Sequence, residues 1–373
     1  MKAVVKTMPQ AGAEYIEVPI PQLRDDEVLI RVHATSICGT DVHIYNWDEW
    51  SARRIGAGRL PQILGHEFCG EIIDRGRSVE GLNRGDNVSA ETHIYHEFDR
   101  QSILGQRHIG ERMKILGVDI NGCFAEYIAV PARVCWKNDK TIPPEFTCIQ
   151  EPLGNATYAV LGEDSDVAGK SMLITGDGPV SLFAIAVAKA CGVAKIIHFG
   201  FWDFNTELGK KLGADYQFIT PRTTSAERLQ GVLDLTEGYG VDIALEMVGT
   251  EDSINDCFAM VRKGGRITAF GIPSSGKVAI DYANGIVFKG CTIFGINGRR
   301  LFDTWYRNSN LLAMGKLDVT AVVTHVMDLK DYAAGFTAML AAPRTSAKIV
   351  LFPDHEEYLK AAARLKRVDK FPS

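Results

Sequence analysis

The sequence lacks three features that indicate a membrane protein, a secreted protein or a nucleic-acid-binding protein. No apolar run approaches the ~20 residues that cross a bilayer, and the first residues lack the apolar core and cleavage site of a secretory signal. No long basic run occurs, and 41 basic against 46 acidic residues leave a net charge of −5. We therefore expect a cytoplasmic protein whose partners are small molecules rather than nucleic acid or a membrane.

The cysteines lack the spacing of a disulfide framework, and none forms a C-x-x-C motif. They are scattered through apolar stretches, at Cys38, Cys69, Cys123, Cys135, Cys148, Cys191, Cys257 and Cys291. In a chain of 373 residues this pattern is typical of reduced thiols packed in a core. The same length favours two domains over one.

The polar and apolar pattern changes near residue 150. Residues 1–150 contain short alternating runs punctuated by Gly, Pro and Asp, which is typical of a largely antiparallel β region. From residue 170, strand-like runs alternate with helical runs and predict a parallel sheet with helices on both faces. One of these helices is expected over 253–265, where two glycines end it. After residue 297 helices and strands are mixed, and a charged helix is expected over 356–370.

A glycine-rich turn lies between a strand-like run and a long apolar helix within residues 173–192. Gly176 and Gly178 allow a tight turn and the close approach of a phosphate, while the helix N-terminus offers free N–H groups. Ser181 stands where the third glycine of G-x-G-x-x-G would be, and it is small enough for close packing. The pattern favours a dinucleotide site, although glycines also end strands for purely structural reasons.

The position that normally distinguishes NAD from NADP carries an unexpected residue. An acidic side chain usually ends the second strand of such a unit and binds the ribose 2′-hydroxyl, but Gly200 occupies this place. Asp203 follows three residues later, and no arginine follows at once to hold a 2′-phosphate. The choice between the two cofactors stays open, with NAD as the weak preference.

Two short segments carry groups that bind zinc. ICGTDVH (37–43) supplies Cys38, and LGHEFCG (64–70) supplies His66 and Glu67. A zinc ion with one open position would let an alcohol lose its proton near neutral pH, after which the carbinol hydride can leave. Thr40 and His43 suit a hydroxyl-to-imidazole relay for that proton. A lone cysteine or histidine is more often a packing residue, so the prediction depends on the whole set.

Six motifs resemble the zinc-dependent medium-chain dehydrogenases, and most of all their L-threonine 3-dehydrogenase branch. They are SICGTDVHIYNWDEW, LGHEFCGEI, GDNVSAETH, GCFAEYIAVP, EPLGNA and GINGR. The resemblance runs to about residue 352 and implies an α/β protein. It implies a GroES-like, mostly antiparallel catalytic domain and a Rossmann domain with a doubly wound parallel sheet. The first would comprise 1–152 and, with the C-terminal helix, 297–373; the Rossmann domain would comprise 153–296.

The resemblance also implies roles for single residues. Cys38, His66 and Glu67 would hold one catalytic zinc, with Glu151 as an exchangeable ligand or part of the proton path, and Thr40 and His43 as the relay. His93 lies where this branch has a substrate-pocket histidine, and Trp47 is either a wall of the pocket or a packing residue. The expected cofactor-binding residues are Gly176, Gly178, Pro179, Val180, Gly200, Asn205, Phe270, Gly271, Ile272, Ile296 and Asn297.

Residues 93–119 depart from the family pattern. Most members carry a structural zinc there on four cysteines, whereas this segment has no cysteine and places His96, Asp99, Ser102 and Gly110 at those positions. Such a set cannot close a tetrahedral zinc site. We therefore expect no structural zinc and a lobe held by packing and hydrogen bonds, or else mobile. A metal site of His96, Asp99 and His108 is the alternative.

Taken together, the motifs predict an enzyme that oxidises a secondary alcohol to a ketone with zinc and NAD(P), and L-threonine is the first candidate substrate. A polyol, sugar or cyclitol is the alternative substrate, and a non-catalytic relative that binds nucleotide is the alternative class of protein. The complete set of ligand and relay residues argues against the second alternative. Family members are dimers or tetramers, so we expect a homodimer or a homotetramer.

Overall fold

The computed structural model describes residues 1–274 and 276–368, which fold as two compact units. Unit 1 comprises Met1–Glu151, Val323–Ala342 and the chain from Ser346, and unit 2 comprises Pro152–Val322 and Pro343–Thr345. Residues 297–322 therefore group with unit 2, whereas the family resemblance implies the returning catalytic domain for them. The reason is their packing within unit 2, where Thr157 donates a hydrogen bond of 2.6 Å to Asn308 and Trp305 is buried.

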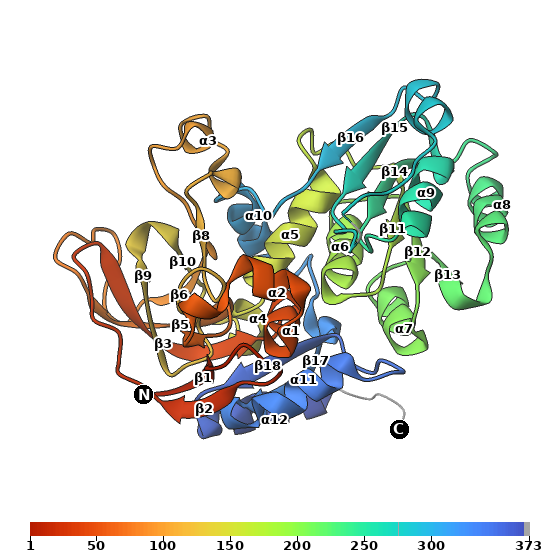
Figure 1. Cartoon of the computed structure of the whole chain (residues 1–373). Coiled ribbons are helices and arrows are strands. Elements are labelled where there is room, and N and C mark those ends of the chain that lie inside the picture. The colour runs from red at the N-terminus through yellow and green to blue at the C-terminus, as the bar shows by residue number, and fades with distance from the viewer. Residues whose placement is uncertain (275, 369–373) are drawn as a thin grey trace. The chain divides into compact units, whose positions relative to one another are not determined.

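Unit 2 is built on a six-stranded sheet in the order β13-β12-β11-β14-β15-β16, and every pairing in it is parallel. This is the strand order of a doubly wound sheet, so the predicted Rossmann architecture is confirmed (Figure 1). Its strands are β11 (Ser171–Thr175), β12 (Lys195–Gly200), β13 (Tyr216–Ile219), β14 (Val241–Glu246), β15 (Val261–Ala269) and β16 (Thr292–Gly295). Its helices are α6 (Pro179–Ala190), α7 (Asp203–Lys211), α8 (Ser225–Leu235), α9 (Glu251–Met260) and α10 (Asp303–Ala313), while α5 (Gln150–Leu161) begins in unit 1.

The core of unit 2 forms because its parallel strands carry apolar residues on both faces. One buried cluster joins strands to helices, and its members include Leu173, Ile197, Val232, Ala244, Met260 and Ile267. Removing such side chains from water contributes roughly 1.5–3 kcal/mol each. This packing fixes the carboxyl ends of the strands along one edge of the sheet.

The helix expected over 253–265 is shorter than predicted. It ends at Met260, and β15 begins at the next residue, Val261. Val261 pairs with Val241, and the register then shifts before Ile243 pairs with Arg266. The glycines that were interpreted as a helix stop therefore form an irregularity inside the strand, because burying Val261 beside β14 outweighs its helical spacing.

Unit 1 is mainly antiparallel. A seven-stranded sheet has the order β10-β6-β5-β3-β18-β17 with β9 paired to β3, and a smaller sheet has the order β2-β1-β4. The exception is the parallel pair β17–β18, which α11 connects. The strands are β1 (Lys2–Lys6), β2 (Glu14–Glu17), β3 (Glu27–Ser36), β4 (Gln62–Ile63), β5 (Glu67–Arg75), β6 (Asn87–Ala90), β9 (Tyr127–Pro131), β10 (Cys135–Lys137), β17 (Val323–Asp328) and β18 (Lys348–Phe352).

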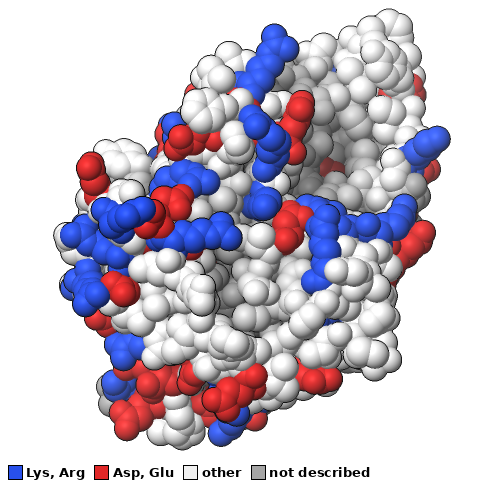
Figure 2. All heavy atoms as spheres, turned by 60° about the vertical axis from the view of Figure 1, so that its left-hand side comes forward, with Lys and Arg blue, Asp and Glu red and all other residues white. Residues whose placement is uncertain are grey.

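Short helices connect and cover these strands. They are α1 (Gly39–Asn46), α2 (Glu49–Arg54), α4 (Pro144–Thr147), α11 (Tyr332–Leu340) and α12 (His355–Val368). α12 agrees with the helix expected over 356–370, whose residues Asp369 and Lys370 lie outside the described residues. Within the described part of the chain, none of the helices is long and apolar enough to span a bilayer. Basic and acidic side chains are interspersed on the face shown in Figure 2.

Residues 93–119 form a small lobe of β7 (His93–Ile94), α3 (Arg100–Ile103) and β8 (Lys114–Ile115), with β7 and β8 antiparallel. Asp99 closes it, because its carboxylate accepts hydrogen bonds from the backbone N–H (2.9 Å) and Nε (2.5 Å) of Arg112. A Cβ on Gly110 would lie only 2.8 Å from Asp99 Oδ2, so glycine leaves room for this contact. Asp99 and Gly110, which the resemblance aligns with zinc-binding cysteines of the family, therefore meet in this closure.

Replacing Asp99 with Ala should loosen the lobe without affecting the rest of unit 1. Backbone amides of residues 97–112 should exchange hydrogen faster, because the acceptor for both Arg112 donors is lost. Hydrogen–deuterium exchange with mass spectrometry measures this, and Asp25→Ala, which breaks the exposed pair with Arg77, is the matched control. Zinc content should not change. Loss of one bound metal on Asp99→Ala would instead support the alternative metal site in the lobe.

Candidate functional site

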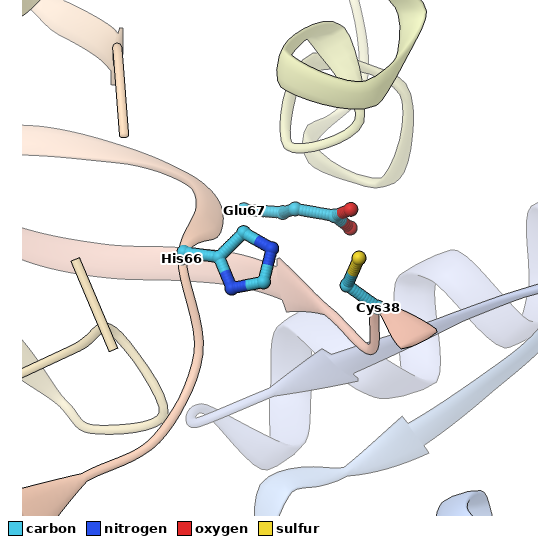
Figure 3. Close-up of side chains that lie close together, drawn as sticks. All are labelled: Cys38, His66 and Glu67. Atoms are coloured by element: carbon cyan, nitrogen blue, oxygen red, sulfur yellow. The ribbon is translucent and has the colours of Figure 1, made fainter. Parts of the chain in front are cut away.

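Strand pairing brings the two cysteine- and histidine-containing segments together. In the β3–β5 ladder Ser36 lies opposite Glu67, so Cys38 follows two residues after the partner of Glu67, and His66 directly precedes β5. One ligand atom from each of Cys38, His66 and Glu67 lies within 4.8 Å of the others, and the three side chains converge (Figure 3). Among the described residues this is the one group of three or more that could hold a metal ion.

A buried carboxylate, that of Asp41, connects both segments. Its Oδ2 accepts the backbone N–H of Cys38 at 2.9 Å, and its Oδ1 accepts that of Gly65 at 3.2 Å. Oδ1 also lies 3.4 Å from Nδ1 of His66. Asp41 is fully buried in the first turn of α1, whose N-cap is Cys38. A carboxylate behind a histidine fixes the orientation of the ring.

A lysine from a distant strand holds the carboxylate of Glu67. Lys348 Nζ, on β18, lies 2.6 Å from Oε2 and 2.8 Å from Oε1 of Glu67, and donates to the carbonyl of Ile37 at 3.2 Å. Ser36 Oγ donates a further hydrogen bond to Glu67. Glu67 and Lys348 have 0% and 2% of their surface exposed. The pair therefore satisfies both buried charges and fixes the carboxylate beside Cys38.

The pKa shifts show that acidic groups at this place stabilise positive charge on their neighbours. Burial by itself lowers the pKa of His66, but Asp41 and Cys38 outweigh it and raise that pKa well above its ordinary value. Burial likewise lowers the pKa of Lys348, whereas Glu67, Cys38 and Glu151 raise it, with a net increase. In the metal-free protein, the acidic groups therefore stabilise positive charge on both His66 and Lys348. A metal cation held by Cys38, His66 and Glu67 would be stabilised by the same acidic groups, with His66 neutral as a ligand.

The donor set fits zinc. Thiolate sulfur, imidazole nitrogen and carboxylate oxygen bind zinc at about 2.0–2.3 Å, which corresponds to ligand atoms roughly 3.5 Å apart in a tetrahedron. The three ligand atoms lie within 4.8 Å of one another, so small side-chain movements would bring them to this separation. Nδ1 of His66 is buried and makes no hydrogen bond of good geometry, although it lies near Asp41. A zinc ion on the other ring nitrogen would favour a proton on Nδ1, directed at Asp41.

The two relay candidates, Thr40 and His43, both lie on α1. Within the described part of the chain, their side chains make no contact with each other. Thr40 Oγ1 lies 4.0 Å from Cys38 Sγ, at the metal cluster. The imidazole of His43 is exposed, and its Nδ1 is hydrogen-bonded to Asp48 Oδ2. Thr40 therefore lies on the cluster side of the helix and His43 on the solvent side. The relay between them stays a prediction.

Three further predicted site residues lie in unit 1. Glu151 is buried, and its charge raises the pKa of Lys348. It is not a member of the three-residue cluster. His93 is buried on β7, where its backbone N–H donates to Glu91 at 3.0 Å. Trp47 ends α1 in a left-handed conformation, with Lys6 Nζ 5.4 Å from its ring centroid.

The glycine-rich turn of unit 2 joins β11 to α6. Gly176 has a φ of +87°, and Gly178 is the N-cap of α6, with no atom within 4 Å of the place where its Cβ would be. The turn is held from behind by His198, whose Nε2 pairs with the Gly176 carbonyl at 2.9 Å. Burial lowers the pKa of His198, so its imidazole is neutral and Nε2–H donates this bond. Free N–H groups and an open approach suit a pyrophosphate.

The other predicted cofactor residues follow neighbouring strands of the same sheet. Gly200 ends β12, Phe270-Gly271-Ile272 follow β15, and Ile296-Asn297 follow β16. Apolar side chains are also exposed here, with 88% of Ile272, 52% of Phe201 and 44% of Val248 accessible. Parallel sheets bind ligands at this carboxyl edge, and exposed apolar groups there would cover the flat rings of a dinucleotide.

Sequence reasoning missed the residues that position the cluster. Asp41 lies within ICGTDVH, three residues after Cys38, and an acidic residue at that spacing is a helix-capping signal that was available. Asp48, the partner of His43, follows five residues after it within a quoted motif. Lys348 gives only a weak signal, a lysine at the start of the apolar run KIVLF. Its partner Glu67 is 281 residues away, so only the fold reveals the pair.

Comparison with known proteins finds a matching family model for a large part of each unit. Residues 24–143 match the model of the alcohol dehydrogenase GroES-like domain, and residues 179–314 match that of the zinc-binding dehydrogenases. L-threonine 3-dehydrogenase of Pyrococcus furiosus is 47% identical over 87% of this chain and 91% of that protein. L-threonine 3-dehydrogenase of Bacillus subtilis is 41% identical over 95% and 99%. The structure of 2R,3R-butanediol dehydrogenase from Bacillus subtilis matches with a TM-score of 0.85 and 26% identity, covering 95% and 99% of the two chains.

Replacing Lys348 with Met should destabilise the metal-free protein, because the Glu67 carboxylate would remain buried without its counter-charge. Breaking one side of a buried pair costs about 3–5 kcal/mol, which urea unfolding in the presence of a chelator would measure. Adding Glu67→Gln to Lys348→Met should recover most of this loss. Lys360→Met, at the exposed pair with Glu357, should leave the unfolding midpoint unchanged. A wild-type midpoint in Lys348→Met would show that Glu67 is uncharged or solvated.

Proposed function

Because this chain belongs to the zinc-binding alcohol dehydrogenase family, we propose that it oxidises the secondary alcohol of L-threonine to a ketone with NAD as the hydride acceptor. The observation that supports this most directly is the convergence of Cys38, His66 and Glu67 beside buried acidic groups that stabilise positive charge. Identity of 40% or more to several L-threonine 3-dehydrogenases over most of the chain supports the substrate.

The reaction breaks two bonds of the substrate carbinol. The O–H bond loses a proton to solvent, and the C–H bond loses a hydride, with its electron pair, to the nicotinamide ring. When bound, zinc lowers the pKa of the substrate hydroxyl and the nicotinamide accepts the hydride. The products are a ketone, NADH and a proton, so atoms and electrons balance.

The chain would contribute positioning and a path for the proton. Cys38, His66 and Glu67 would hold the metal, while Asp41 fixes the first two and Lys348 fixes the third. Thr40 places a hydroxyl beside Cys38, where the substrate oxygen would approach. Asp48 holds Nδ1 of His43, which leaves Nε2 as the basic nitrogen that can take up the proton and release it to water. Glu151, buried near Lys348, is the second proton acceptor that we propose.

Elemental analysis of protein purified without chelator should give about one zinc per chain. Cys38→Ser should lower zinc affinity by more than about 100-fold, because it removes a ligand rather than a residue that only positions one. Turnover should fall together with the zinc content. Cys69→Ser is the matched control, because that thiol is also in unit 1 but lies outside the cluster. Wild-type turnover in Cys38→Ser would rule out the metal mechanism.

The substrate is tested on the same preparations. L-threonine should be oxidised with a higher kcat/KM than 2,3-butanediol or sorbitol, with NAD and NADP each supplied in turn. A preference for a diol would retain the zinc mechanism and change the substrate assignment. Zinc binding without oxidation of any of these alcohols would favour a non-catalytic relative.

We also propose that the protein is a homo-oligomer, a dimer or a tetramer. β16 is an edge strand of the parallel sheet, and its free hydrogen-bonding edge is a ready template for a second chain. Ile293 on this strand is 41% exposed, and Tyr282 and Phe288 just before it are 65% and 70% exposed. An apolar edge of this kind is usually covered in the assembled protein.

Ile293→Lys should reduce the mass measured by light scattering, because a charge would be buried at the pairing edge. Tyr216→Lys is the matched control, because Tyr216 is also 41% exposed and lies on β13, the opposite edge strand. A monomeric wild-type protein would refute the proposal. An unchanged mass in Ile293→Lys, with a mass change in Tyr216→Lys, would move the interface to the other edge.

A further inference from the structure

Asp177 lies at the centre of the glycine-rich turn, between Gly176 and Gly178. Its carbonyl accepts a hydrogen bond of 2.8 Å from Asn205 Nδ2, on α7. Asn205 is fully buried, so it fixes the backbone of the turn rather than meeting solvent. Together with the bond from His198 to the Gly176 carbonyl, this holds the Asp177 backbone in one place.

The carboxylate of Asp177 reaches from this turn to the end of the neighbouring strand, β12. Its Oδ2 accepts the backbone N–H groups of Phe201 at 2.9 Å and Trp202 at 2.7 Å, the first two residues after the strand. A negative charge is therefore present at the carboxyl end of β12. Oδ1 takes no hydrogen bond within the described part of the chain, although the residue as a whole is only 6% exposed.

Gly200, where an acidic side chain would normally lie, has no room for one. A Cβ built on it would lie 2.1 Å from Thr206 Oγ1 and 3.1 Å from Thr206 Cβ. Thr206 cannot easily turn away, because its hydroxyl donates to the carbonyl of Trp202 at 2.8 Å. Any larger residue at 200 would thus displace the first turn of α7.

We propose that Asp177 replaces the missing acid of β12 and selects NAD over NADP, an inference that rests on the proposed function. Oδ1 accepts a hydrogen bond from the 2′-hydroxyl of the adenosine ribose, while the two N–H groups hold Oδ2. A 2′-phosphate in the same place meets a fixed carboxylate, and like charges at contact distance repel strongly. The selectivity for NAD over NADP thus comes from Asp177 in the glycine-rich turn rather than from a residue at the end of β12.

The other charged groups near this strand end are already paired with each other. Asp203 begins α7, and its Oδ2 lies 2.6 Å from Nη2 of Arg222, with both side chains 63% exposed. Arg222 is therefore held by Asp203, and its exposed charge is screened by water. This pair is the competing explanation, since Asp203 could repel a 2′-phosphate or Arg222 could attract one.

Equilibrium titration of the protein with cofactor tests the assignment without any turnover. Dissociation constants for NAD, NADP and 2′-deoxy-NAD would be measured by calorimetry on wild type, Asp177→Asn and Asp177→Ala. The preference of wild type for NAD over NADP should fall at least ~10-fold in both variants, because the repelling charge is lost. The penalty for 2′-deoxy-NAD should be present in wild type and absent in Asp177→Ala.

Two variants separate Asp177 from its neighbours. Glu207→Gln removes a negative charge from an exposed position of α7 and should leave the NAD preference unchanged. Asp203→Asn tests the competing pair, and a larger effect there than in Asp177→Asn would overturn the assignment. So would an unchanged preference in Asp177→Asn, or tighter binding of NADP than NAD by wild type. Failure of wild type to bind either cofactor would instead overturn the proposed function, and the assignment with it.

Discussion

The carboxylate of Asp41 is the constraint on which the metal cluster depends. It binds the backbone N–H groups at Cys38 and Gly65 and lies beside the His66 ring, so one buried group fixes both segments at once. The β3–β5 register brings these segments close, but strand pairing alone does not orient a thiol and an imidazole. The same acid stabilises positive charge on its neighbours, as the raised pKa of His66 shows. A metal cation at the cluster would benefit from the same surroundings.

The Glu67–Lys348 pair shows how the fold buries a second acidic side chain in the same place as Asp41. The ammonium of Lys348 offsets the buried charge of Glu67, which would otherwise be costly. Lys348 lies on β18, a strand that enters the sheet of unit 1 late in the chain, beside β3. The local charge balance therefore forms only when the returning segment docks. The pairing of β18 with β3 thus completes both the sheet of unit 1 and the contacts of Glu67.

Much of the architecture follows from the sequence, because its signals are local. Alternating strands and helices predict the parallel sheet, and the spacing of ICGTDVH and LGHEFCG predicts the cluster. The misses involve non-local contacts. The helix over 253–265 ended early because Val261 pairs with Val241, and residues 297–322 joined unit 2 through contacts such as Thr157–Asn308. Gly200 correctly marked an absent acid, but only the turn geometry shows that Asp177 reaches the same strand end.

The hydrogen bonds between Asp99 and Arg112 form a closure of the lobe that itself uses neither a metal nor a thiol. Four thiolates around zinc would be vulnerable to oxidants, which attack thiolates, and to chelators, which remove the metal. A carboxylate–guanidinium closure offers neither reagent a target. With the lobe held in this way, loss of the catalytic zinc proposed above would stop turnover and leave this part of the fold intact. Activity could then return with the metal and would not require refolding of the lobe.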